Sequence, residues 1–396
     1  MSIRNHKLCV RARNRRDLPQ PLPALLGQHW SVRARRGWVR SCIPTAALSF
    51  ITALRLSAFV WLPASALTTP TVAETRELRL SHQWVAEGDA RDRAARVFVD
   101  EVQKRIANLR ISIVSTSSLG VKPPEQLNEM LKGRIDMTVY PLFYGSPYIP
   151  ELAISLLPGI PASSQMGKRL KDTRFHEQLQ SLAELHGVHI LTWWWLGGGF
   201  ASRNREIALP GSVQGLTARG GDKSFDLMLT RAGGRVSVMP SNDISGKMAS
   251  GELDLALTSY ESLVSYRIFQ YAKFATFGGY GLWTSLQPII ISKTEWQKLS
   301  YSEQAAFAEA AEISNAFFEG SQSDAEQKAI KAFTEAGATV RTLSFEEYRA
   351  WLELARESSW RDYESISLQA QDLLSEMMIS FIESGDEKLP QGSVPR

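Results

Sequence analysis

The chain of 396 residues is long enough for two domains or for one large two-lobed domain. Its 44% hydrophobic and 22% charged residues are ordinary for a globular protein. The net charge of +4 is unevenly placed, because residues 1–66 hold eleven basic residues and one acidic residue, which leaves 34 basic and 40 acidic residues for the rest. A nucleic-acid-binding protein needs a basic face, so we expect no nucleic-acid partner.

The first 66 residues have the pattern of an export leader. The basic segment Arg33 to Arg40 precedes an apolar stretch, Ile43 to Leu62, and Ala64-Ser65-Ala66 follows as the small-residue pattern at which signal peptidases cut. Arg55 interrupts the apolar stretch, which argues against a membrane-spanning helix; an uncleaved anchor is the alternative. We therefore expect a periplasmic protein whose mature part is not inserted in the membrane.

Two further features of the leader bear on export. Roughly forty residues precede the apolar stretch, which is unusually long and points to a translation start downstream of Met1. Arg35-Arg36 loosely resembles a twin-arginine signal. Both cysteines of the chain, Cys9 and Cys42, lie in the leader. The exported part would then have no disulfide, thiolate metal site or cysteine nucleophile.

From residue 77 onward, strand-like and helix-like patterns alternate. The expected elements of the first unit are the strand Leu78–His82, a helix from Asp89, the strand Ile111–Val114, the helix Pro123–Lys132 and the strand Ile135–Tyr140. This order of strands and helices predicts a mainly parallel sheet covered by helices.

A second unit of the same kind follows roughly 120 residues later. Its expected elements are the strand Gly215–Ala218, the helix Ser224–Arg231, the strand Arg235–Met239, the helix Asn242–Gly251 and the strand Leu253–Thr258. Gly133 and Gly251 stand at equivalent joints, where glycine can end a helix in the left-handed conformation before a buried strand. This repetition favours two related lobes, although α/β proteins also repeat such a joint by chance.

The remaining chain is almost wholly helical in pattern after a strand at Pro288–Ser292, and we expect its helices to brace both lobes. The predicted fold is α/β with a ligand cleft between two lobes. Its expected organisation is a leader (1–66), a first lobe (77–200), a second lobe (201–288), a hinge-spanning strand with helices on both lobes (289–384) and a disordered tail (385–396).

Motifs that would carry catalysis are absent from the sequence: HExxH, GxSxG, a P-loop, and GxGxxG after a strand. Gly197-Gly198-Gly199 lacks the spacing of a phosphate loop, and a bend between lobes explains it better. His186 and His189 lack a nearby third ligand, so a solvated helix end is the favoured interpretation. We therefore expect no enzymatic activity, no cofactor and no metal-ligating residues, while the sequence does not settle whether a metal ion helps to bind the ligand.

The carboxyl ends of the predicted strands select the candidate ligand contacts. Ligands of open parallel sheets bind at that edge, which faces the cleft in a two-lobed protein. The candidates are His82 and Trp84 after the first strand, Tyr140, Phe143 and Tyr144 after the third, Arg219 and Gly220 in the first turn of the second unit, and Thr258, Ser259 and Tyr260 after its last strand. A guanidinium there presents a fork of donors that matches a carboxylate. On spacing alone, an exposed loop arginine explains Arg219 equally well.

Three segments of the second unit follow one another in a distinctive order. They are Val213 to Arg219, Arg231 to Pro240 and Gly251 to Asp254. In this order they resemble the solute receptors of TRAP transporters (DctP-type), and the resemblance extends over nearly all of residues 77–335. It implies a periplasmic-binding-protein-like fold. It also implies that Arg219 binds the carboxylate of a small organic acid, which the receptor delivers to TRAP membrane subunits.

Two departures from the family pattern bear on the ligand. Some acid-binding members carry a second arginine twenty residues before the first, where this chain has Gly199, and an asparagine roughly where it has Thr258-Ser259-Tyr260. These departures argue against a sialic-acid-like ligand. Aromatic residues expected near the cleft favour an acid with an apolar or aromatic body, although each one alone is also explained as core: Trp84, Tyr140, Phe143, Tyr144, Trp195, Tyr260 and Trp283.

Three alternative functions remain compatible with the sequence. The receptor of an ATP-driven importer shares the two-lobed architecture, and neighbouring genes for TRAP membrane subunits would separate the two. A sensor that passes its ligand state to a membrane kinase needs the same binding site. An exported α/β enzyme is disfavoured by the missing nucleophile and metal motifs.

Overall fold

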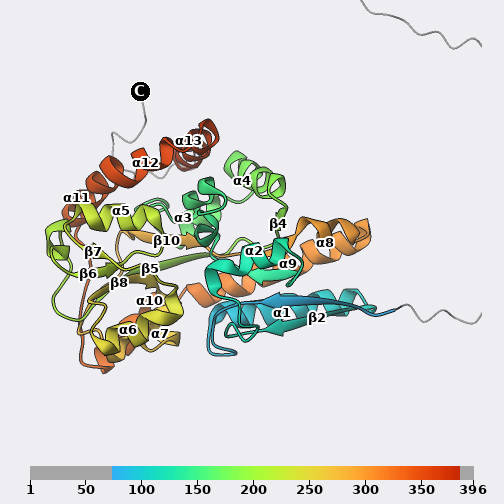
Figure 1. The fold of residues 1–396 in the computed structure, drawn as a ribbon, viewed down its shortest axis with the longest axis horizontal. Coiled ribbons are helices and arrows are strands. Elements are labelled where there is room, and N and C mark those ends of the chain that lie inside the picture. Colours follow the sequence, from blue (N-terminus) through green and yellow to red (C-terminus); the bar gives the residue numbers. More distant parts are fainter. Residues whose placement is uncertain (1–73, 384–396) are drawn as a thin grey trace, which may run out of the picture. The chain divides into compact units, whose positions relative to one another are not determined.

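The computed structural model describes residues 74–383, which form two sheets surrounded by helices (Figure 1). The predicted leader and the predicted disordered tail lie outside these residues. Within residues 74–383, no helix is both long enough and apolar enough to span a membrane.

The first sheet has five strands in the order β2-β1-β3-β11-β4. The strands are β1 (Arg76–Ser81), β2 (Leu109–Val114), β3 (Met137–Val139), β4 (Val188–Ile190) and β11 (Ile289–Ser292). β1 pairs in parallel with β2 and β3, as the order of the first unit predicts. β11 is antiparallel to both β3 and β4, because it enters this sheet from the other lobe.

Helices and short 3₁₀ turns link the strands of the first sheet. They are α1 (Ala90–Arg105), η1 (Pro123–Glu125), α2 (Gln126–Leu131), η2 (Leu142–Gly145), η3 (Pro150–Leu156), α3 (Ser164–Arg169) and α4 (Arg174–Leu185). α1 begins where the sequence predicts, because the carboxylate of Asp89 caps it by accepting the backbone N–H of Arg91. The helix buries Ala94, Phe98 and Val102 on one face.

The second sheet has seven strands, six of them in the order β12-β9-β5-β8-β6-β7, with β10 paired to β5. The strands are β5 (Trp195–Ser202), β6 (Thr217–Arg219), β7 (Arg235–Val236), β8 (Leu255–Ser259), β9 (Phe274–Thr276), β10 (Trp283–Leu286) and β12 (Thr339–Arg341). β6 pairs in parallel with β7 and β8, which repeats the first sheet's arrangement. β7 is shorter than the predicted strand Arg235–Met239: after Ser237, whose N–H reaches the Ala218 carbonyl, residues 238–240 leave the sheet.

The connections of the second sheet are also short helices. They are η4 (Pro210–Val213), α5 (Lys223–Arg231), η5 (Ser241–Asp243), α6 (Ile244–Ser250), α7 (Tyr260–Ser265), η6 (Ile268–Gln270) and α10 (Ala325–Glu335). Gly251 ends α6 with φ +83°, and Gly133 follows α2 with φ +76°. Both predicted glycine joints therefore have the left-handed conformation that favours glycine.

The chain crosses between the sheets three times, the third time through residues 293–338 on the way from β11 to β12. It passes from β4 to β5 through Leu191 to Trp194 and returns from β10 to β11 through Gln287 and Pro288. The first two crossing segments are bonded to each other, since the Gln287 N–H donates to the Trp194 carbonyl (2.9 Å) and the Leu191 N–H to the Ile289 carbonyl (2.9 Å). A paired, two-stranded connection of this kind suits a hinge.

The interpretation of Gly197 to Gly199 as a bend between lobes is wrong, because they lie inside β5. Gly198 is paired with both Trp283 and Ser259, and a Cβ on Gly198 would collide with the Thr258 carbonyl. A Cβ on Gly199 would lie 2.5 Å from the Thr276 carbonyl. These glycines permit close strand packing. The chain passes from the first sheet to the second between β4 and β5, and not at residue 200 as the predicted lobe boundary has it.

The remaining helices are α8 (Lys293–Lys298), α9 (Tyr301–Gln322), α11 (Phe345–Ala355), the π turn η7 (Arg356–Trp360), α12 (Arg361–Glu364) and α13 (Leu368–Glu383). α9 packs along α1, whereas α11 and η7 pack on α5, and α13 packs on α4 (Figure 1). Trp360 reinforces this arrangement by donating from its indole to the Pro158 carbonyl (3.0 Å). The C-terminal helices therefore brace both lobes, as predicted.

Trp351 of α11 provides a test of this bracing. Its ring is fully buried, lies 5.2 Å from that of Phe200, and donates to the Ala208 carbonyl (2.8 Å). Trp351→Ala leaves a cavity and an unpaired carbonyl, so we expect the unfolding free energy, measured in urea, to fall by about 3–5 kcal/mol. The exposed neighbour Arg349→Ala should change it by less than about 0.5 kcal/mol. Equal effects of the two changes would show that α11 contributes little.

Candidate functional site

Arg219, the last residue of β6, is only 1% exposed, which excludes an exposed loop arginine. Its Nε donates to the Met239 carbonyl (3.1 Å), Nη1 to the Leu257 carbonyl (2.8 Å) and Nη2 to the Tyr144 hydroxyl (3.2 Å). A guanidinium has five N–H groups. One N–H on each terminal nitrogen therefore has no acceptor among residues 74–383. Two such donors can pair with the oxygens of a carboxylate.

Gly220 and Gly221 let the chain turn closely around this guanidinium. Gly221 has φ +120°, and a Cβ there would lie 3.2 Å from Nη1 of Arg219. A Cβ on Gly220 would collide with Phe225, and the Gly220 N–H donates to the Asp226 carboxylate (3.3 Å). The turn therefore packs closely against Arg219, and a side chain at either glycine would disturb this packing.

Two carboxyl groups at the start of α5 set the charge around Arg219. Burial raises the pKa of Asp222 to about 8, although its Oδ1 accepts the Phe225 N–H as the helix cap. Burial also raises the pKa of Asp226 to about 6, against the opposing effects of the Arg219 charge and the Gly220 N–H. Near pH 7, Asp222 thus retains its proton, whereas Asp226 is largely ionised and supplies a counter-charge to Arg219. The feature that singles out Arg219 is therefore its pair of N–H groups without acceptors rather than an unbalanced charge.

Four of the predicted aromatic residues form one cluster that reaches Arg219. The Phe143 ring lies 4.8 Å from Tyr144 and 6.4 Å from Trp283, and Tyr140 lies 6.2 Å from Tyr144. Tyr144 links this cluster, which already contains Trp283 of the second sheet, to Arg219, because its hydroxyl accepts from both Arg219 and the Ser241 N–H (3.1 Å). The indole N–H of Trp283 is buried without an acceptor among the described residues.

The structure places three other predicted contacts away from this cluster. Tyr260 points into a second hydrophobic core, packs on Phe277 and accepts the Gly278 N–H (2.9 Å). Thr258 lies inside β8, paired with Gly199. Trp195 lines a separate cavity of about 580 Å³ between α3 and α9. Side chains alternate between the faces of a strand, and the sequence alone did not fix which face each residue takes.

His82 and Trp84 follow β1 as predicted; the His82 ring is fully hydrogen-bonded, whereas the indole N–H of Trp84 is buried without an acceptor among the described residues. His82 is fully buried, with Nε2 3.0 Å from the Asp92 carboxylate and Nδ1 accepting the Trp84 N–H (3.3 Å). The guanidinium carbon of Arg91 lies over the Trp84 ring, 4.2 Å from the centroid of that ring. Direct ligand contact by His82 stays a prediction that would require one of these hydrogen bonds to break.

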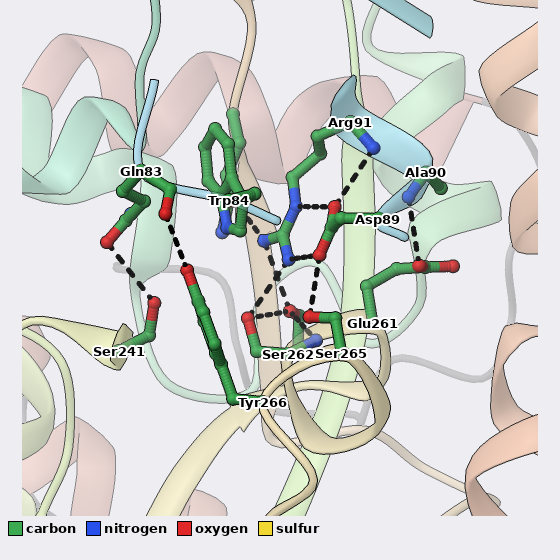
Figure 2. A network of polar contacts seen from close by, with 12 residues as sticks. Gln83, Trp84, Asp89, Ala90, Arg91, Ser241, Glu261, Ser262, Ser265 and Tyr266 are labelled. Carbon is green, nitrogen blue, oxygen red and sulfur yellow. Dashed lines mark hydrogen bonds and ion pairs between the residues drawn. The ribbon is translucent and has the colours of Figure 1, made fainter. Parts of the chain in front are cut away.

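A polar network joins the lobes beside Trp84 (Figure 2). Arg91 of α1 reaches Ser259 and Ser262 at the start of α7, and Tyr266 donates to the Gln83 carbonyl (3.1 Å). Of the predicted site residues, Ser259 belongs to this network. Sequence reasoning missed Arg91 and Asp89. One signal was present, because a basic residue in the first turn of a helix opposes the helix dipole and needs a compensating partner.

Two α/β lobes joined by paired crossing strands, with a buried arginine where their facing edges meet, define a two-lobed ligand-binding protein. Residues 80–365 match the family model of bacterial extracellular solute-binding protein, family 7 (DctP). The chain belongs to this family of TRAP solute receptors. No cluster of three or more potential metal ligands occurs in residues 74–383.

The relatives agree with this assignment. A solute-binding protein of Albidiferax ferrireducens is 34% identical over 74% of this chain and 88% of its own length. The DctP C4-dicarboxylate-binding periplasmic protein of Rhodobacter capsulatus is 23% identical over 73% of this chain and 87% of its own length. The crystal structure of a TRAP periplasmic solute-binding protein from Rhodoferax ferrireducens, with bound malonate, is 31% identical, covers 78% of this chain and 99% of that chain, and has a TM-score of 0.75.

The buried Asp222 gives a pH-dependent prediction. Its folded-state pKa of about 8 lies above the ordinary value of 3.8, so unfolding releases a proton and wild-type stability falls as pH rises from about 4 to about 8. Asp222→Asn keeps the helix cap without this titration. Relative to the wild type, the unfolding free energy of Asp222→Asn, measured by thermal unfolding, should rise by up to about 1.4 kcal/mol per pH unit over that window. The exposed Asp243→Asn is the control, and parallel pH profiles for Asp222→Asn and the wild type would contradict the assignment.

Proposed function

We propose that this protein is the extracytoplasmic receptor of a TRAP-type secondary transporter, that it binds a small organic acid through Arg219, and that it delivers the acid to membrane permease subunits. The observation that carries the proposal is the pair of unused N–H donors on the buried Arg219. In a site closed to water, these donors and the guanidinium charge select a carboxylate over a neutral group.

The surroundings of Arg219 suit a small acid. Tyr144 and Trp283 bring a hydroxyl and an unpartnered indole N–H to the same aromatic cluster, so an acid can be received by further donors beyond the guanidinium. Gly199 leaves no room for a second arginine, since its Cβ position is filled by the Thr276 carbonyl. The Rhodoferax ferrireducens relative holds malonate, a small dicarboxylate. We infer the same ligand class for this protein.

The experiment is titration calorimetry of malonate and related acids with the wild-type protein, Arg219→Ala and Arg219→Lys. Removing Arg219 leaves a buried carboxylate without its cation, so Arg219→Ala should weaken binding by about 100-fold or more. Arg219→Lys keeps the charge but loses the fork of donors, and it should give an intermediate affinity.

Arg235→Ala is the matched control, because Arg235 is an exposed arginine on the adjacent strand β7. It should bind as the wild type does. Unchanged affinity in Arg219→Ala would overturn the role of Arg219. A wild-type protein that binds none of a panel of mono- and dicarboxylates would overturn the proposed function itself.

A further inference from the structure

We propose that Arg91, held by Asp89, is a positioning residue for ligand binding: it fastens the first lobe to the second in the closed arrangement and contacts no ligand. This inference rests on the proposed function, because closure of the lobes is what encloses the acid. Arg91 and Asp89 themselves lie outside the predicted site, although Arg91 contacts two of the predicted residues, Trp84 and Ser259.

Arg91 is fixed on its own lobe from two sides. Its Nε and Nη2 donate to the two carboxylate oxygens of Asp89 at 2.8 and 2.7 Å, which is a bidentate ion pair. Its guanidinium lies over the Trp84 ring at 4.2 Å. The side chain is 1% exposed and Asp89 is fully buried. Little conformational freedom therefore remains for the guanidinium to lose when the lobes meet.

The remaining donors of Arg91 point to the other lobe and to the hinge (Figure 2). Nη2 donates to the Ser262 hydroxyl (3.0 Å), and Nη1 donates to the Ser259 hydroxyl (3.3 Å) and to the Gln287 side-chain oxygen (2.8 Å). Ser259 and Ser262 begin α7 of the second lobe, whereas Gln287 lies in a crossing segment. All five N–H groups of Arg91 thus have protein acceptors, and none is left for a ligand.

Two more hydrogen bonds join the same helix ends across the cleft. The Ser265 hydroxyl donates to Asp89 (2.8 Å), and the Ala90 N–H donates to the Glu261 carboxylate (3.2 Å). The start of α1 therefore meets the start of α7, and each supplies a carboxylate to the contact. Figure 2 shows Asp89 and Glu261 on opposite sides of this joint, with Arg91 beside Asp89.

Arg91 is what allows the buried Asp89 and the half-buried Glu261 to lie close together. Although burial pulls the pKa of Asp89 upward, the charge and hydrogen bonds of Arg91 hold it below its ordinary value. Burial and the negative charge of Asp89 raise the pKa of Glu261, and Arg91 opposes that rise. Without Arg91, lobe closure would bury two mutually repelling carboxyl groups. In an open form, water would solvate them, so the cost falls on the closed form.

The cost of closing the lobes without Arg91 would lower the ligand affinity. When only the closed form holds the ligand tightly, the apparent dissociation constant rises in proportion as the closed population falls. We therefore expect Arg91→Gln to weaken acid binding by about tenfold or more while leaving the chemistry at Arg219 intact.

The test compares Arg91→Gln with Arg79→Gln in the full chain. Arg79 also binds an aspartate, since it donates to Asp136 from Nε (3.1 Å) and Nη2 (3.4 Å), but both residues belong to the first lobe. Malonate affinity is measured by calorimetry, and inter-lobe distance by spin labels at Ala107→Cys and Arg231→Cys in a Cys9→Ser, Cys42→Ser background. Both label positions are exposed, one in each lobe.

We expect Arg91→Gln to bind malonate about tenfold more weakly than the wild type, and to shift the unliganded distances toward the open form. Saturating malonate should restore the wild-type distances. Arg79→Gln should change neither quantity. Ser262→Ala should weaken malonate binding less in the Arg91→Gln variant than in the wild type, because the two residues act through one contact.

Unchanged affinity and distances in Arg91→Gln would overturn the inference. Weaker binding with unchanged distances would also overturn it, since Arg91 would then act on the ligand directly. If the wild type binds no acid, the proposed function fails, and the unliganded distances of the wild type and Arg91→Gln still decide whether Arg91 holds the lobes together.

Discussion

The burial of the Arg219 charge is the constraint on which the binding site depends. A guanidinium removed from water needs acceptors for its N–H groups and a counter-charge. The protein supplies three neutral acceptors, from Met239, Leu257 and Tyr144, and Asp226, whose pKa of about 6 leaves it largely ionised at pH 7, is a nearby counter-charge. Two N–H groups of Arg219 are left without acceptors among residues 74–383, and we propose that the carboxylate of a bound acid accepts them. The glycine turn and the Tyr144 hydroxyl serve this same requirement.

The two buried arginines of the cleft illustrate how the fold separates binding from positioning. Arg91 is neutralised by the bidentate contact with Asp89 and has every donor occupied. Arg219 has neither a full ion pair nor a complete set of acceptors. We propose that the first of these cations fastens the lobes and that the second binds an anion. Arg91 lies beside the crossing segments, since it donates to Gln287.

Local patterns predicted most of the elements and the position of Arg219. Helix caps such as Asp89 and left-handed glycines such as Gly251 act within a few residues, so the sequence shows them directly. Tertiary contacts decided the rest. Gly197 to Gly199 suggested a bend, whereas strands β8 and β10 pressing on both edges require glycine there. The partners of Arg91 in the second lobe and in the crossing segment lie 168 to 196 residues away, and no short-range pattern reveals them.

The most direct test of the central claim is a crystal structure of this protein with malonate bound. The account predicts one malonate carboxylate within hydrogen-bond distance of both terminal nitrogens of Arg219, enclosed by Tyr144 and Trp283. It also predicts that the Asp89–Arg91 pair bridges to Ser262 without touching the ligand. Malonate located elsewhere, such as in the cavity between α3 and α9, with Arg219 making no contact to it, would contradict the account.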